Sequence, residues 1–254
     1  MAYIDIETAR ADFRVIAGGH WKSMNPRQLP SQPTALIMEG IFPKDKAFYS
    51  DIEGKAPLSN ANFHKEFNKI VERGQKAGIL IAMADPIADM EKVIAKVQRD
   101  IETMIDVTWS HPFLTARAMV ATFLFWDLIP SRINKQSWSY RAASEYAKNL
   151  TDEGFSIAGL RNLIMSQRAL AVADHQIKHG IERPCIVIGC GCYHIGIVED
   201  LTLTPNEIQD KIRSDPYYGL YFSPKEIGRI VFAQYDLGRL RWNKGVIKNT
   251  QAIR

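Results

Sequence analysis

The sequence predicts an α/β (α+β) fold, with a central mixed sheet built from both ends of the chain and a helical insert in the middle. Runs of apolar and β-branched residues occur before residue 85 and again after residue 184, as is typical of buried strands. A long region of helical periodicity separates them. No low-complexity linker divides the chain, so we expect a single domain over residues 1–254. The insert is expected at roughly 87–180 and a C-terminal hairpin at roughly 228–247.

The first part of the chain contains three strand signals. Residues 13–17 are followed by a pair of glycines, and residues 35–39 lie between a proline and a glycine. The third signal, at 79–84, is a continuous apolar run that follows a predicted helix at 62–76. Such a run predicts a strand that is covered on both faces of a mostly parallel sheet.

Helices dominate the middle of the sequence, and strands return near its end. Apolar residues at helical spacing predict helices at 87–104, 112–128, 137–150 and 156–178. Strand signals follow at 185–188 and 229–235. A turn at 236–238 then leads into residues 239–246, which predicts the terminal hairpin.

The distribution of charge argues against a nucleic-acid partner. Lys and Arg number 32 and Asp and Glu 28, which gives a formal net charge of +4, and the basic residues are spread along the chain. A nucleic-acid-binding protein would concentrate them in a block. We therefore expect no nucleic-acid partner. A peptide or a small molecule is instead the expected ligand of the site considered below, and the sequence is compatible with a homo-oligomer.

Three features predict a cytoplasmic protein without a membrane span. Residues 1–12 lack the apolar h-region of a secretory signal. The longest apolar stretch, 116–129, is interrupted by Arg117 and Asp127, which favours a buried helix over a membrane span. The three cysteines lie close together, and an odd number so placed is a poor disulfide framework.

One layout occurs twice in the sequence. Residues 15–20 and 187–194 each contain an apolar strand, a glycine turn and a histidine, which is His20 in the first and His194 in the second. Ligands of open α/β sheets bind at the carboxyl ends of the strands. Glycine at these ends allows a sharp turn and leaves room for a ligand. We therefore expect both imidazoles to lie in one crevice.

Carboxylates follow two of the other predicted strands. Glu39 ends the second strand and Asp85 ends the third, so both are expected beside His20 and His194. Two neutral imidazoles and a carboxylate make an open site for a divalent metal ion of unspecified identity. The alternative is that a polar residue ends a strand for solubility alone, an explanation that fits four such residues together less well than one.

Two other groups are less suited to hold a metal. His175 and His179 have the spacing of a helical metal pair, but the glutamate of the metalloprotease motif is missing and the helix ends there. We expect them outside the crevice, at a helix terminus. Cys190 and Cys192 lie near His194, and both metal ligation and a nucleophilic Cys192 remain open alternatives.

Arg161 and Asn162 lie on a predicted helix of small and apolar residues. A guanidinium there must pair with a carboxylate or contact a ligand. The sequence leaves open a structural ion pair, a clamp for an anionic group of the substrate, and orientation of Glu39. We expect a carboxylate or a ligand oxygen within hydrogen-bond distance of Arg161, and Glu39 and Asp85 are the candidate carboxylates.

Several blocks of the sequence resemble the TraB/PrgY/GumN group, which is related to the Tiki proteins. The blocks are residues 18–23, 35–39, 79–85, 161–165 and 187–197. That group is described as sharing two G-x-x-H motifs and a glutamate, and Tiki proteins as metal-dependent proteases. The resemblance implies that His20 and His194 are the motif histidines and that Glu39 is the glutamate. The first motif has Ala17 where the group has glycine.

Together these patterns predict a metal-dependent hydrolase, with peptide bonds as one candidate substrate. His20, His194, Glu39 and Asp85 are the expected metal ligands, and the first three are the expected catalytic residues. Arg161, with Asn162, is expected to bind substrate and to stabilise negative charge. The alternative is a non-catalytic regulatory module that binds a peptide, haem or small anion in the same crevice, or a structural protein with a vestigial site.

Overall fold

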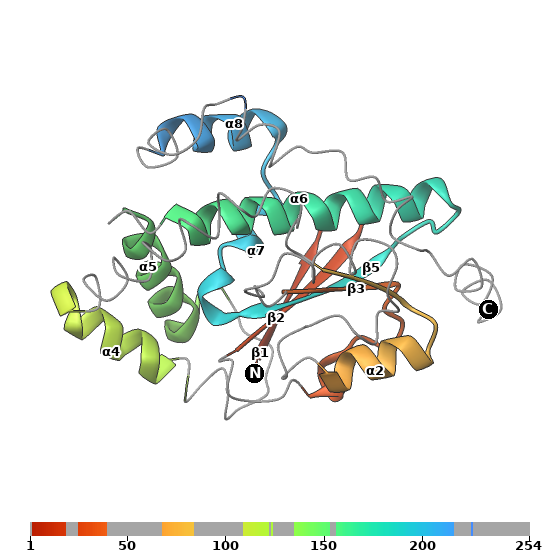
Figure 1. The fold of residues 1–254 in the computed structure, drawn as a ribbon, viewed down its shortest axis with the longest axis horizontal. Helices are drawn as coiled ribbons and strands as arrows, with labels where there is room; N and C mark the ends of the chain where they lie inside the picture. Colours follow the sequence, from red (N-terminus) through yellow and green to blue (C-terminus); the bar gives the residue numbers. More distant parts are fainter. Residues whose placement is uncertain are drawn as a thin grey trace, which may run out of the picture.

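The computed structural model describes residues 2–18, 25–39, 68–83, 109–121, 123, 135–152, 156–215 and 225. Within these residues, five strands form one mixed sheet, and helices cover both of its faces (Figure 1). The predicted α/β fold, with strands from before and after a helical region in one sheet, is confirmed. The predicted helix at 87–104 and the predicted hairpin at 228–247 lie outside the described residues.

The sheet places the last described strand of the sequence at its centre. The strands are β1 (Ala2–Glu7), β2 (Asp12–Gly18), β3 (Ala35–Met38), β4 (Leu80–Met83) and β5 (Cys185–Gly191). Their order is β1-β2-β5-β3-β4. β1 is antiparallel to β2, whereas β2, β5, β3 and β4 are parallel. Every residue of β5 after Cys185 is buried, as expected for a parallel strand that is covered on both faces.

The described helices agree with the sequence pattern. They are η1 (Pro26–Gln28), α2 (Asn68–Lys76), α4 (Pro112–Ala121), α5 (Trp138–Asp152), α6 (Ser156–Lys178), η5 (Cys192–His194), α7 (Ile197–Asp200) and α8 (Pro205–Ser214). α6 has the predicted bounds, and α4 and α5 lie within the predicted helical insert. In the described part of the chain, no helix combines the length and the apolar character needed to cross a membrane.

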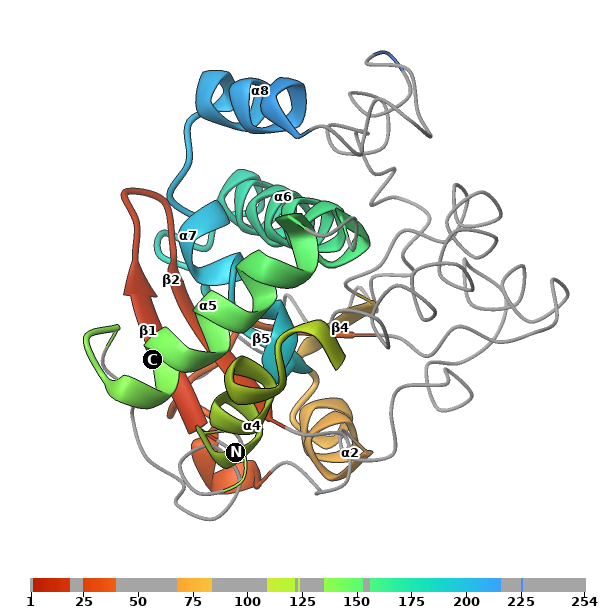
Figure 2. The same ribbon diagram turned by 90° about the vertical axis from the view of Figure 1, so that its left-hand side faces the viewer.

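Side chains of the sheet alternate between two buried faces. Phe13 of β2 and Ile188 of β5 belong to one core cluster with Met165 of α6. α2 approaches the sheet at Leu36 of β3, where a Cβ atom on Gly74 would collide with the leucine side chain. This period-two alternation places α6 and α2 on opposite faces of the sheet (Figures 1 and 2).

Several described elements were not among the predictions, and β1 and α8 are the longest of them. β1 pairs along its full length with β2, and its Ile4 and Ile6 are buried in the core. α8 begins with a capping box, in which Thr204 Oγ1 accepts from the backbone N of Glu207 and Glu207 Oε2 accepts from the backbone N of Thr204. The segment after β5 therefore continues the fold for two helices beyond the central strand.

Candidate functional site

The site lies where the parallel strands β3 and β5 end side by side. Met38, the last residue of β3, is paired with Gly189 of β5. After β5 the chain enters η5 and α7, which pack against α6, whereas α2, the next described helix after β3, covers the opposite face. Ligand sites of open α/β sheets lie at the carboxyl ends of such neighbouring strands.

His194 is held by a hydrogen bond to a side chain of α6. It is the last residue of η5, and its side chain is 8% exposed. Its Nδ1 donates to Asn162 Oδ1 at 2.8 Å. An amide oxygen only accepts, so this bond requires the proton on Nδ1. The lone pair of a neutral ring is then on Nε2, which lies 3.3 Å from Glu39 Oε1.

Glu39 is a buried carboxylate with partners from three elements. Its side chain is 3% exposed, and its backbone N donates to the carbonyl oxygen of Gly189, which continues the ladder from β3 to β5. Oε2 accepts from the backbone N of Gly191 at 2.6 Å. Oε1 accepts from Arg161 Nη2 at 2.8 Å. These charge-assisted hydrogen bonds offset the cost of burying the carboxylate charge.

Arg161 has the carboxylate partner that the sequence predicts for it. Its side chain is 13% exposed, and it joins α6 to the end of β3 through Glu39. The expected proximity of Glu39 and His194 is likewise confirmed. His20 and Asp85 lie outside the described residues, so their expected positions at this edge stay predictions.

His175 lies near the C-terminal end of α6, and His179 directly follows that helix, as expected. Their rings stack with centroids 4.0 Å apart, and His179 Nδ1 donates to the carbonyl oxygen of His175. Arg161 lies near the other end of this 23-residue helix, about 20 Å away along the axis. Burial, followed by the nearby His179 and Lys178, lowers the pKa of His175. These histidines therefore take no part in the crevice.

The cysteines are free thiols in or directly after β5. Cys190 belongs to the core cluster, and Cys192 is 3% exposed. Burial is the main cause that raises the pKa of the Cys185 thiol. A buried thiol of this kind behaves as a small apolar residue, which favours a packing role for Cys190 and Cys185.

Two contributions to the site were missed at the sequence level. Asn162 was expected to bind substrate, but its Oδ1 is hydrogen-bonded to His194. A Cβ atom on Gly196 would lie 2.7 Å from Asn162 Nδ2, so glycine leaves room for that amide. The sequence shows a glycine two residues after His194. It does not show that Asn162 of α6 lies against that glycine in the folded chain.

Within the described ranges, no group of three or more His, Cys, Asp or Glu side chains is arranged to hold a metal ion. Comparison of the chain with protein-family models, with curated proteins and with solved structures found no match. The resemblance to the TraB/PrgY/GumN group therefore stays a prediction. We call Glu39, Arg161, Asn162 and His194 the Glu39–His194 site, and its geometry is the basis for a functional proposal.

Proposed function

We propose that the chain is a metal-dependent hydrolase and that His194 and Glu39 are two of the residues that would hold its divalent ion. The observation that carries the proposal is the 2.8 Å contact between His194 Nδ1 and Asn162 Oδ1, because an amide oxygen accepts and the contact therefore calls for a proton on Nδ1. A neutral ring then directs the lone pair of Nε2 toward a carboxylate oxygen 3.3 Å away. Two acceptors in this position need a cation between them, which is a metal ion or a proton.

The separation of the two atoms suits a metal ion. Two ligands of one tetrahedral zinc ion, each bound at about 2.1 Å, are about 3.4 Å apart. The observed 3.3 Å agrees with that value. Histidine ligands also commonly donate their second ring N–H to an oxygen that fixes the ring, which is the role of Asn162 here. His20 and Asp85 are the further ligands that we propose.

The residues of the chain have separate tasks in this proposal. Asn162 fixes the tautomer and orientation of His194, and the backbone N–H of Gly191 holds Glu39 Oε2. Oε1 has two lone pairs, so it can accept from Arg161 and face His194 at once. The guanidinium of Arg161, which is paired with Glu39, would also stabilise a negative charge that develops on the substrate. A bound divalent ion supplies a water of lowered pKa as nucleophile.

The resemblance supports peptide bonds as the substrate. The alternative, a module that binds a peptide, haem or an anion without catalysis, applies if a proton occupies the space between His194 and Glu39. In that case His194 is an imidazolium that pairs with Glu39. The site then holds two cations, His194 and Arg161, beside the single carboxylate of Glu39. The two proposals differ in metal content and in turnover.

Metal analysis of the purified chain distinguishes them. We expect about one equivalent of zinc or another divalent ion in the unmodified protein. His194→Ala and Glu39→Gln should lose it, and His20→Ala should weaken its binding. His175→Ala is the matched control, because that histidine lies at the far end of α6, and it should retain the ion.

Hydrolysis of a fluorogenic peptide library is the second measurement. Activity should disappear with a chelator and return when the metal is restored. Equal metal content in the unmodified protein and in His194→Ala would refute the metal site. A metal-free protein in which the ¹⁵N chemical shifts of His194 show both nitrogens protonated at neutral pH would support the binding module instead.

A further inference from the structure

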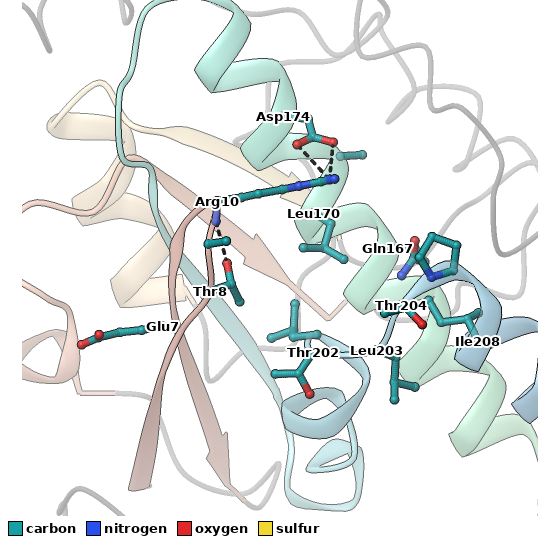
Figure 3. A pocket seen from close by; sticks show the side chains of 14 residues that line it. Glu7, Thr8, Arg10, Gln167, Leu170, Asp174, Thr202, Leu203, Thr204 and Ile208 are labelled. Carbon is teal, nitrogen blue, oxygen red and sulfur yellow. Dashed lines mark hydrogen bonds and ion pairs between the residues drawn. The ribbon is translucent and has the colours of Figure 1, made fainter.

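A pocket lies at the opposite end of the parallel strands from the Glu39–His194 site. Its volume is about 670 Å³, within the range of pockets for small ligands. It is bordered by the turn between β1 and β2, by α6, and by the segment from α7 into α8 (Figure 3). Because that turn precedes β2, the pocket lies at the amino end of the parallel strands, whereas Glu39 and His194 follow their carboxyl ends.

Aliphatic side chains provide much of the pocket surface. They are Leu170 of α6, Leu201 and Leu203 of the connection after α7, and Ile208 of α8. Burying apolar ligand surface against such side chains gives about 25 cal/mol per Å². This surface therefore favours a ligand with an aliphatic body.

Most polar side chains around the pocket are already engaged within the protein. Arg10 pairs with Asp174 at 3.1 Å, as Figure 3 shows. The hydroxyl of Thr8 donates to the carbonyl oxygen of Ala11, and that of Thr202 to the carbonyl oxygen of Glu199. Thr204 is occupied by the capping box of α8. These groups are not available to recognise a ligand without loss of an existing contact.

Gln167 differs from these groups. Its Nε2 is buried and has no hydrogen-bond partner among the described residues. A buried donor without a partner costs about 1–3 kcal/mol. Gln167 is also one of the residues that line the pocket, so its amide belongs to the pocket wall (Figure 3). A ligand group that both donates and accepts would then pair with Nε2 and Oε1 together.

We propose that this pocket binds a small neutral molecule with an aliphatic body and a carboxamide head, which the amide of Gln167 recognises. A second amide matches Gln167 because each has one carbonyl oxygen and one N–H donor facing the other. A charged head is disfavoured, because Arg10 and Asp174 neutralise each other and the carboxylate of Glu7, the other charged side chain at the pocket, points away from it (Figure 3).

Calorimetric titration with three ligands of equal chain length tests the ligand class. The probes are octanamide, octanoate and octylamine. We expect octanamide to bind about tenfold more tightly than either charged probe. Equal or tighter binding of octanoate or octylamine would overturn the proposed preference for a neutral head.

Variants test the position of binding. Gln167→Leu should weaken octanamide binding about tenfold, the effect of losing a pair of hydrogen bonds. Leu170→Trp should abolish it by filling the pocket. Gln209→Leu is the control, because Gln209 is exposed on α8 and does not line the pocket. Circular dichroism verifies that both pocket variants are folded. If either Gln167→Leu or Leu170→Trp still binds octanamide as tightly as the unmodified protein, the proposed site is refuted. Neither variant touches the Glu39–His194 site, so this result is independent of the proposed hydrolase function.

Discussion

At the residue scale, the Glu39–His194 site is a buried charge that several elements satisfy together. β3 supplies Glu39, α6 supplies Arg161 and Asn162, and the end of β5 supplies the N–H of Gly191. Removing any of these partners leaves a charged or polar group buried without compensation, which is more costly than losing a surface contact. Stability and site geometry are therefore linked in these residues.

Substitution of Arg161 tests this link. Arg161→Leu should lower the free energy of unfolding by about 3 kcal/mol, because Glu39 loses its cation while remaining buried. Arg161→Lys should recover only part, since an ammonium group lacks the planar fork of the guanidinium. Arg117→Leu is the control, because its ion pair with Glu145 is exposed and should contribute less than about 1 kcal/mol. Urea unfolding measures all three, and unchanged stability in Arg161→Leu would contradict the ion-pair role.

Gly196 tests the position of Asn162. Gly196→Ala should displace the amide of Asn162 and with it the ring of His194, at a cost of about 1–3 kcal/mol. The φ of Gly196 is −56°, so alanine introduces no backbone strain and the effect comes from the close approach alone. In an Asn162→Ala background the same substitution should have little further effect. Equal effects in both backgrounds, measured by thermal melts and by the NMR signals of His194, would show that the two residues are uncoupled.

At the element scale, α7 and α8 are joined by an ion pair with a buried end. Asp200 is 0% exposed, and its Oδ1 accepts from Lys211 Nζ at 2.6 Å. Burial raises the pKa of Asp200 to about 6, although Lys211 opposes the shift. In the unfolded chain the carboxyl titrates near its ordinary value of 3.8. Between these values the folded protein holds a proton that the unfolded chain has lost, so stability falls as pH rises.

Asp200→Asn isolates this contribution. The quantity to follow is the free energy of unfolding of the unmodified protein minus that of Asp200→Asn. This difference should fall by up to about 3 kcal/mol between pH 4 and pH 6 and stay constant above pH 7. Asp210→Asn is the control, because Asp210 is exposed and should show no such trend. Denaturant unfolding at intervals from pH 4 to pH 8 provides the comparison. A pH-independent difference between the unmodified protein and Asp200→Asn would contradict a buried, shifted carboxyl.

The elements that follow long apolar runs were predicted from the sequence. β1 and α8, whose patterns are shorter and richer in charged residues, were missed. α6 and the strands β2 to β5 follow continuous or periodic apolar runs in the sequence. β1 alternates Ile4 and Ile6 with acidic residues, which is the period of a half-buried strand, so it could also have been predicted. α8 could have been predicted from the capping box at Thr204 and from the proline that follows it.

The same limit applies to the site. Glu39 and His194 could be selected because each follows an apolar strand, and strand ends share an edge of a parallel sheet. The pairing of Arg161 with a carboxylate followed from the cost of an unpaired guanidinium. The bond between Asn162 and His194 depends on how α6 is rotated over the sheet, which no local pattern specifies.

At the scale of the whole molecule, the site depends on the central place of β5. This strand comes late in the sequence but lies between β2 and β3, so the site unites segments of the chain that are far apart. Contacts between segments so far apart in sequence form slowly in folding, because the intervening chain must first be closed into a loop. The order of the strands also predicts where the fold opens locally. β5 is paired on both sides, whereas β1 lies at an edge of the sheet that the described strands form, so β1 should open more readily.

Amide hydrogen exchange tests this organisation. Exchange should be slowest in residues 186–190 of β5, which are buried on both faces, and faster in β1. The amide of Gly191 donates to the carboxylate of Glu39 at 2.6 Å, so Glu39→Gln should accelerate its exchange because a neutral amide oxygen is a weaker acceptor. The amide of Ile188, held by the backbone ladder, is the internal control and should change less. Exchange in β1 as slow as in β5 would contradict the strand order. An unchanged Gly191 amide in Glu39→Gln would mean that the carboxylate does not hold the end of β5.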